Sequence, residues 1–186
     1  MISVTQLLVP ALVSAVLVFI VSSIVHMATP WHANDFRRLP NEDAVLAALR
    51  PFNIGPGAYV APRPSSMKEM GSPEFQAKAT QGPNVMMNVM PNGHGGMGAQ
   101  LALWFIYSAV IALFAGYVTS RATGTGTDYK IVFKFVGAIA FGAYAMGLWQ
   151  MSIWYRRSWT VTLKSTLDGV LYACLTAGAF GWLWPR

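Results

Sequence analysis

The sequence predicts an all-α integral membrane protein, a four-transmembrane-helix bundle with a long, Pro/Gly-rich, mostly irregular extramembrane segment between helices 1 and 2. Hydrophobic residues make up 54% of the 186 residues and charged residues only 11%, whereas soluble domains carry about 25% charged residues. The apolar residues also gather in runs close to the ~20 residues that cross the hydrocarbon core of a bilayer. In water such a chain would expose large apolar patches, so lipid is the expected solvent.

The first span is expected at about residues 7–27. The stretch from Leu7 to Val25 contains no charged residue. Pro10 lies near its start, where a missing backbone N–H is tolerated best. The first basic residue is Arg37, so the run lacks the positive region that precedes a cleaved signal sequence. We therefore expect a retained helix.

Three further spans are expected at about residues 101–119, 131–155 and 161–184. Aromatic residues such as Trp104 and Trp154 lie near their ends, as is typical of side chains at the level of the lipid headgroups. Each run is also too long and too uniformly apolar for a buried strand. The chain is therefore expected to form a single membrane domain over residues 1–186.

Residues 30–98 have a different character and hold nine of the eleven prolines. A short helix is expected at 42–50, because Asn41 can cap it, acidic residues begin it and Pro51 ends it. A short strand is indicated at Ala58–Ala61. The stretch from Gly71 to Gly98 shows neither helical nor strand periodicity, and it is expected to be irregular.

Asp168 is the most informative single residue, because a carboxylate about two turns into a membrane helix is costly and marks a functional site by default. Lys164 lies on the same helical face and is expected to pair with it. Arg156 and Arg157 precede the same helix. The favoured interpretation is a salt-bridged helix start that fixes the depth of the helix. An ion or proton path and a site for anionic lipid remain as alternatives.

Small residues recur at every fourth position in three of the predicted helices, a spacing that lets another helix approach closely. The stripes predict helix contacts within the chain, between copies or with other membrane proteins. Their members are Ser108, Ala112 and Gly116; Ala138 and Gly142; and Gly169, Ala173, Ala177 and Gly181.

A tract rich in methionine offers thioether and imidazole ligands that together suit Cu(I). Methionine also fills irregular gaps in packing, so copper is only an alternative, and no cofactor is the main expectation. The tract consists of Met86, Met87, Met90, His94 and Met97.

His26 and His32 flank the end of the first span, with Asp35 nearby. Their separation is not a helical metal-ligand spacing, and Pro30 interrupts the helix between them. A structural role is therefore expected, with haem or metal binding as the lesser alternative.

The sequence contains no phosphate-binding glycine loop, HExxH, CxxC or GxSxG motif, and we expect a non-enzymatic protein. Its basic residues are thinly spread, so lipid rather than nucleic acid is the expected partner. The leading hypothesis is a structural, accessory or assembly subunit of a membrane complex, or a homo-oligomer. A small oligomeric channel or transporter using Asp168, Lys164 and Gln150, and a copper-handling protein, are the alternatives.

The ending GVLYACLTAGAFGWLWP and the four-span plan resemble small bacterial inner-membrane proteins. This resemblance implies a multi-pass protein of the bacterial inner (plasma) membrane. It implies no activity.

Overall fold

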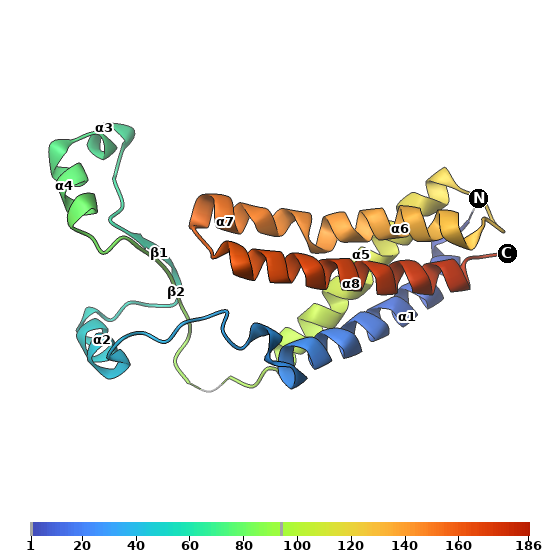
Figure 1. Ribbon diagram of the computed structural model, residues 1–186, viewed down its shortest axis with the longest axis horizontal. Coiled ribbons are helices and arrows are strands. Elements are labelled where there is room, and N and C mark those ends of the chain that lie inside the picture. The colour runs from blue at the N-terminus through green and yellow to red at the C-terminus, as the bar shows by residue number, and fades with distance from the viewer. Residues whose placement is uncertain (1, 94) are drawn as a thin grey trace. The chain divides into compact units, whose positions relative to one another are not determined.

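The computed structural model describes residues 2–93 and 95–186 and is mostly helical. The chain divides into two compact units. The bundle unit comprises Met1–Phe36 and Gly96–Arg186, and the small unit comprises Arg37–Gly95. The long helices all belong to the bundle unit (Figure 1).

The described residues contain four helices that are long and apolar enough to cross a membrane, which confirms the four predicted helices. Their ends lie within three residues of the predicted ends. They are Val4–Ala28 (α1, Val4–Ser23, extended by a π-helical turn, Ile24–Ala28), Gly98–Ala122 (α5), Tyr129–Tyr155 (α6, Tyr129–Tyr144, and α7, Trp149–Tyr155) and Trp159–Leu183 (α8).

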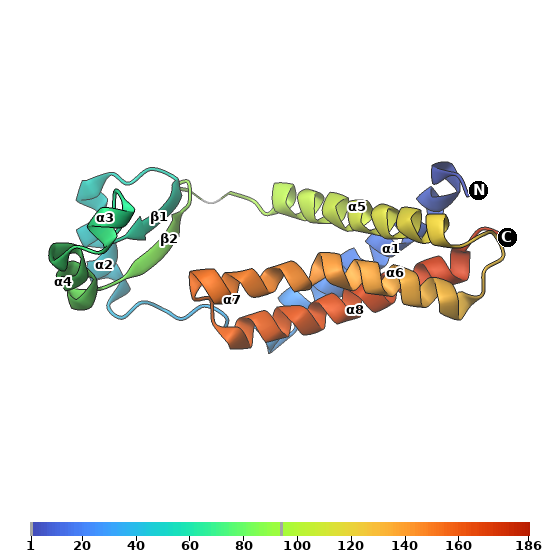
Figure 2. The same cartoon turned by 90° about the horizontal axis from the view of Figure 1, so that it is seen from above.

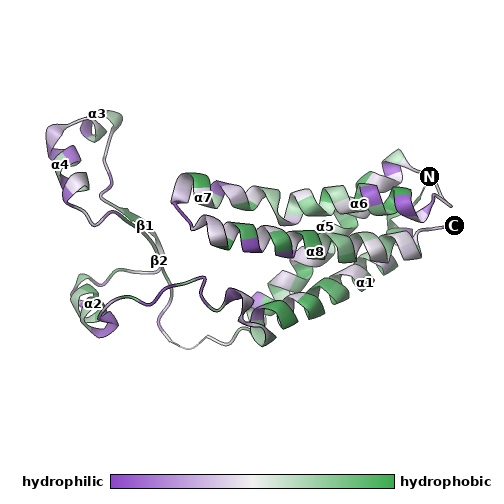
Figure 3. Ribbon diagram, in the orientation of Figure 1, coloured by the Kyte–Doolittle hydropathy of each residue, from purple (hydrophilic) through white to green (hydrophobic). Residues whose placement is uncertain are grey.

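The helices of the bundle unit form a closed ring, in which α8 packs on α6 and α1, and α5 packs on α1 and α6 (Figures 1 and 2). Phe180 of α8 is fully buried and reaches Gly116 of α5 across the ring. The long helices are largely apolar along their length (Figure 3). Exposed apolar side chains on them include Leu12, Leu103, Val110, Phe114 and Leu167.

The third span is not the continuous helix that the sequence predicts. It breaks at Ala145, which has φ −121° and ψ −44°, and a 3₁₀ turn at Met146–Leu148 separates α6 from α7. Gly169 of α8 lies against the break so closely that an added Cβ would come within 2.7 Å of the Cβ of Ala145. This close approach of two helices is a tertiary effect that overrides the local helix preference of the chain.

The predicted contact stripe of the third helix does not face the interior of the bundle unit. Ala138 is exposed and Gly142 is half-exposed, with open space beside it. The buried face of α6 instead runs through Val132, Val136 and Ala140. Ala138 lies two residues beyond Val136, which turns it about 200° round the helix and away from the interior.

The predicted stripes on α5 and α8 lie in the interior. Ser108, Ala112 and Gly116 of α5 are buried, as are Gly169 and Ala177 of α8. The remaining members on α8 are Ala173, which is buried, and Gly181, which packs against the ring of Tyr129.

The small unit contains more regular structure than the sequence predicts. A helix lies at the expected place (α2, Glu42–Leu49), followed by β1 (Gly57–Ala61) and a short helix (α3, Met67–Met70). The stretch expected to be irregular contains α4 (Pro73–Gln81) and β2 (Val85–Val89). The two strands pair antiparallel with Tyr59 opposite Met87. Sequence periodicity missed β2 because pairing with β1, not local alternation, stabilises it.

Candidate functional site

The end of the first span departs from regular helix geometry. Residues Ile24–Ala28 form a π-helical turn, a rare feature that occurs frequently at functional sites. The side chains of the turn bond its free carbonyl groups, with His26 Nδ1 3.0 Å from the Ser22 carbonyl oxygen and the Thr29 hydroxyl donating to the Val25 carbonyl at 2.6 Å. A carbonyl oxygen only accepts, so Nδ1 of His26 carries the hydrogen of the bond to Ser22.

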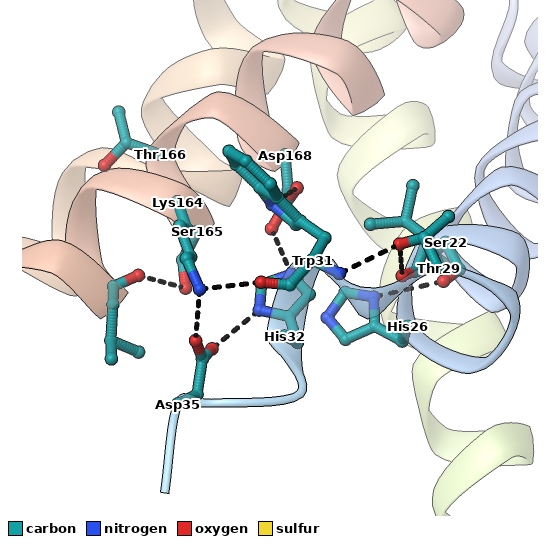
Figure 4. A network of polar contacts seen from close by, with 12 residues as sticks. Ser22, His26, Thr29, Trp31, His32, Asp35, Lys164, Ser165, Thr166 and Asp168 are labelled. Atoms are coloured by element: carbon teal, nitrogen blue, oxygen red, sulfur yellow. Dashed lines mark hydrogen bonds and ion pairs between the residues drawn. The ribbon is translucent and has the colours of Figure 1, made fainter.

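Pro30 begins a 3₁₀ turn, Pro30–His32, that turns the chain back onto α8. The indole N–H of Trp31 donates to Asp168 Oδ1 at 3.1 Å, and His32 Nε2 lies 2.9 Å from Asp168 Oδ2 (Figure 4). Asp168 is buried with 7% of its surface exposed. Both carboxylate oxygens therefore have hydrogen-bond donors, as a buried charge requires.

His32 lies between two carboxylates, because its Nδ1 is 2.6 Å from Asp35 Oδ2. Lys164 donates to the other oxygen of Asp35 at 3.0 Å and to the Trp31 carbonyl at 2.6 Å. Burial by itself raises the pKa of Asp35, but the hydrogen bonds and charges of His32 and Lys164 outweigh it and hold this pKa below its usual 3.8. The result is a compact network of two carboxylates and two basic side chains.

The predicted pairing within α8 is wrong in its partner. In the described residues Lys164 pairs with Asp35, and Asp168 bonds Trp31 and His32. Helical spacing placed Lys164 near Asp168 but carried no information about a segment more than 130 residues away in the sequence.

His26, His32 and Asp168 each offer one ligand atom, and these atoms lie within 4.8 Å of one another. The imidazole rings are stacked with centroids 4.2 Å apart and an interplanar angle of 14°. Each group also has an orienting partner: the Ser22 carbonyl for His26, Asp35 for His32 and Trp31 for Asp168. Such partners characterise metal-binding histidines, whose other ring nitrogen donates to a carbonyl or carboxylate.

A cavity of about 470 Å³ adjoins this cluster within the bundle unit. His26 and Asp168 belong to its wall, so ligand atoms of the cluster border the cavity. All four long helices contribute to the lining, which is mostly apolar and aromatic. The lining residues are Ser22, Ser23, His26, Met27, Met97, Leu101, Trp104, Tyr107, Tyr144, Leu148, Ser165, Asp168, Gly169 and Tyr172.

The other predicted charged residues lie at the turn between α7 and α8. Arg156 ends α7 in the left-handed conformation with φ 56°. Arg157 donates to the hydroxyl of Ser165 at 3.2 Å. Neither residue belongs to the cluster of His26, His32 and Asp168.

The methionine tract is divided between the two units. Met86 and Met87 are successive residues of β2 and so point to opposite faces of the ribbon. Met97 lines the cavity of the bundle unit, whereas Met90 is an exposed residue of the small unit. His94 lies outside the described residues.

Sequence reasoning assigned His26 and His32 a structural role and missed their meeting with Asp168. The signal was a pair of histidines on either side of a proline at the end of a long apolar helix, in a chain that also carries a carboxylate within another apolar helix. Comparisons with protein-family models, with curated proteins and with solved structures find no match to this chain. Its function is therefore inferred from the geometry of the site.

Proposed function

We propose that the chain is a multi-pass integral membrane protein whose bundle binds a divalent first-row transition-metal ion, such as Zn²⁺ or Fe²⁺, at His26, His32 and Asp168. The four apolar helices with exposed apolar side chains support the membrane location. The observation that carries the metal proposal is that all three ligand groups converge and that each has its own orienting partner. Two imidazoles and a carboxylate suit these ions, and three protein ligands leave a coordination position free.

Charge balance is consistent with such an ion. His32 lies between the carboxylates of Asp35 and Asp168, with one ring nitrogen against each. A metal ion held by Nε2 would leave the contact between Nδ1 and Asp35 in place as the orienting partner. His26 would supply the second nitrogen and Asp168 a carboxylate oxygen.

The test of both parts of this proposal starts with membranes from cells that express the chain. We expect the chain to remain in the membrane pellet after alkaline carbonate treatment and to require detergent for extraction. Elemental analysis after incubation with Zn²⁺ should then find about one ion per chain. His26→Ala should weaken binding by about 100-fold or more, since one of three ligands is lost. His26 is the informative position because its only hydrogen bond in the described residues is to its own helix turn.

His94→Ala and Glu74→Gln are the matched controls, and both should bind the ion as the wild type does. Unchanged binding in His26→Ala would overturn the metal proposal. Loss of metal only when Met86, Met87, Met90 and His94 are replaced would favour the copper tract instead. A chain released by carbonate would overturn the membrane assignment.

A second candidate function, an accessory or assembly subunit, is supported by the small unit. None of its described residues is fully buried, although it carries many apolar side chains. A unit of this size without a core gains stability from a partner. The exposed apolar residues include Leu39, Leu46, Leu49, Phe52, Val60, Met67 and Met70.

Native-gel migration after mild extraction tests this second candidate. We expect a species larger than one chain, and we expect Leu46→Ser with Leu49→Ser to reduce it. Ala47→Ser with Ala48→Ser changes neighbouring exposed positions of α2 and should leave it intact. Migration of the wild type as a single chain contradicts the idea. Homo-oligomerisation and location in the bacterial inner membrane remain predictions.

A further inference from the structure

Two lysines lie on the outward face of the otherwise apolar helix α6. Lys130 and Lys134 are both exposed, whereas the side of α6 that faces the interior carries Val132, Val136 and Ala140. Hydrophilic positions stand out on this part of α6, near the end of the bundle unit where α8 finishes (Figure 3). In the proposed membrane location, this face of α6 meets lipid.

Lys134 is the more unusual of the two lysines, because it lies within the apolar stretch, where a charge is costly. It follows the start of α6 at Tyr129 by five residues, about 7–8 Å along the helix. The side chains of Ile131 and Phe135 beside it are apolar and exposed. A helical side chain points towards the N-terminus of its helix, so the ammonium group of Lys134 extends towards Lys130 and the headgroup level. The two positive charges therefore approach each other near the membrane surface.

The chain itself does not neutralise these charges. In the part of the chain that the structure describes, neither lysine side chain takes part in an ion pair or a side-chain hydrogen bond. Asp128 caps α6 by accepting from the backbone N–H of Lys130 at 2.9 Å. Arg121 of α5, at the same end of the bundle unit, instead donates to the Ile2 carbonyl at 3.0 Å. Like charges four residues apart on a helix repel each other, and more strongly where water is scarce, so Lys130 and Lys134 indicate an anion from outside the chain.

The lysines lie beside the contact between α6 and α8. An added Cβ at Gly137 of α6 would come within 3.3 Å of the Cβ of Ala177 in α8. At 100° per residue, Lys130 and Lys134 point about 20° and about 60° away from the direction of Gly137. Trp182, near the end of α8, is 78% exposed, as is typical of an aromatic residue at the level of the lipid headgroups. This location suits the headgroup of a lipid.

We propose that Lys130 and Lys134 bind the phosphate group of an anionic phospholipid beside the contact between α6 and α8. A phosphate carries the charge that neutralises the two lysines, and its oxygens accept the hydrogen bonds that ammonium groups donate. The acyl chains of the lipid cover the exposed apolar side chains of Ile131 and Phe135, which a free phosphate ion would leave uncovered. The inference rests on the proposed membrane location of the bundle, but it does not require the metal ion.

Native mass spectrometry of the full chain in detergent tests this site. The chain is incubated with an equimolar mixture of dioleoylphosphatidylglycerol and dioleoylphosphatidylcholine, which share their acyl chains and differ in the net charge of the headgroup. We expect about one tightly bound phosphatidylglycerol per chain. Its preference over phosphatidylcholine should be at least about tenfold, since each of two basic groups near the membrane surface contributes about fivefold.

Lys134→Gln should reduce this preference about fivefold, and Lys130→Gln with Lys134→Gln should remove most of it. Lys134→Arg keeps the charge and should bind phosphatidylglycerol as the wild type does. Lys68→Gln with Lys78→Gln removes two exposed lysines of the small unit and is the matched control. It changes the net charge equally and should leave the preference intact. Uptake of Zn²⁺ should be the same in all four variants.

Several outcomes overturn the inference. They are equal retention of the two lipids by the wild type, an unchanged preference in Lys130→Gln with Lys134→Gln, and an equal loss in the control variant. Displacement of phosphatidylglycerol by an equal concentration of inorganic phosphate would also overturn it, in favour of a site for the free ion. A chain that stays in carbonate-treated membranes but shows no lipid preference overturns this inference alone, whereas release by carbonate overturns the membrane location on which it rests.

Discussion

Asp168→Ala is expected to lower the free energy of unfolding in detergent by about 3–5 kcal/mol. The change removes the acceptor for Trp31 and one of the two carboxylates that neutralise His32 and Lys164. The remaining charges stay buried without full compensation, and that imbalance is the source of the loss. Denaturant-induced unfolding followed by circular dichroism measures it.

Two comparisons make the Asp168 result specific. Asp128→Ala removes an exposed carboxylate that caps α6 through the Lys130 N–H at 2.9 Å, and it should lower the stability by only about 1 kcal/mol. Asp168→Asn keeps an acceptor for Trp31 and should fall between the two. Hydrogen exchange at residues 29–36 should rise in Asp168→Ala, because the network anchors that segment to α8. Equal stability of Asp168→Ala and Asp128→Ala would show that the network contributes nothing.

Gly116→Ala is expected to destabilise the bundle by about 2–3 kcal/mol, because the centre of the four-helix bundle has no room for an added methyl group. A Cβ at this position would lie 2.2 Å from Phe180 Cε1 and 2.7 Å from its Cζ. The ring of Phe180 is fully buried and cannot swing out. Thermal unfolding in detergent measures the loss.

Gly178→Ala in α8 is the matched control for Gly116→Ala. Its Cβ would meet only the Tyr129 hydroxyl, at 3.9 Å. It should be neutral or stabilising by up to about 1 kcal/mol, from helix propensity alone. The double change Gly116→Ala with Phe180→Leu should recover part of the loss. If Gly116→Ala and Gly178→Ala unfold at the same temperature, the close packing of α5 on Phe180 is not a determinant of stability.

The four long helices were predictable because their signal is local: long apolar runs, rare charges and aromatic ends. The break at Ala145 was not, since alanine favours helices and the neighbour at the break, Gly169, comes from another helix. The helix α4 had a local signal that went unused. Ser72 followed by Pro73 and Glu74 is a helix start, and the Ser72 hydroxyl accepts from the Phe75 N–H at 3.2 Å.

The candidate site was predictable only in part. Asp168 was singled out because a carboxylate in an apolar helix is costly. Its partners were not found, because helical spacing identifies neighbours within one helix, and Trp31 and His32 approach from a segment 137 and 136 residues away in the sequence. Helix or strand periodicity does not predict the π-helical turn and the 3₁₀ turn that bring them there.

The buried face of α8 limits where residues can be inserted in the chain. Successive turns of this helix place Asp168, Tyr172, Thr176 and then Phe180 in the interior. Insertion of one residue after Thr176 would rotate everything beyond it by about 100°. Phe180 would then leave the centre of the ring while Asp168 kept its partners. A change of length within this helix would therefore separate the cluster of His26, His32 and Asp168 at one end from the packing of Phe180 against Gly116 at the other.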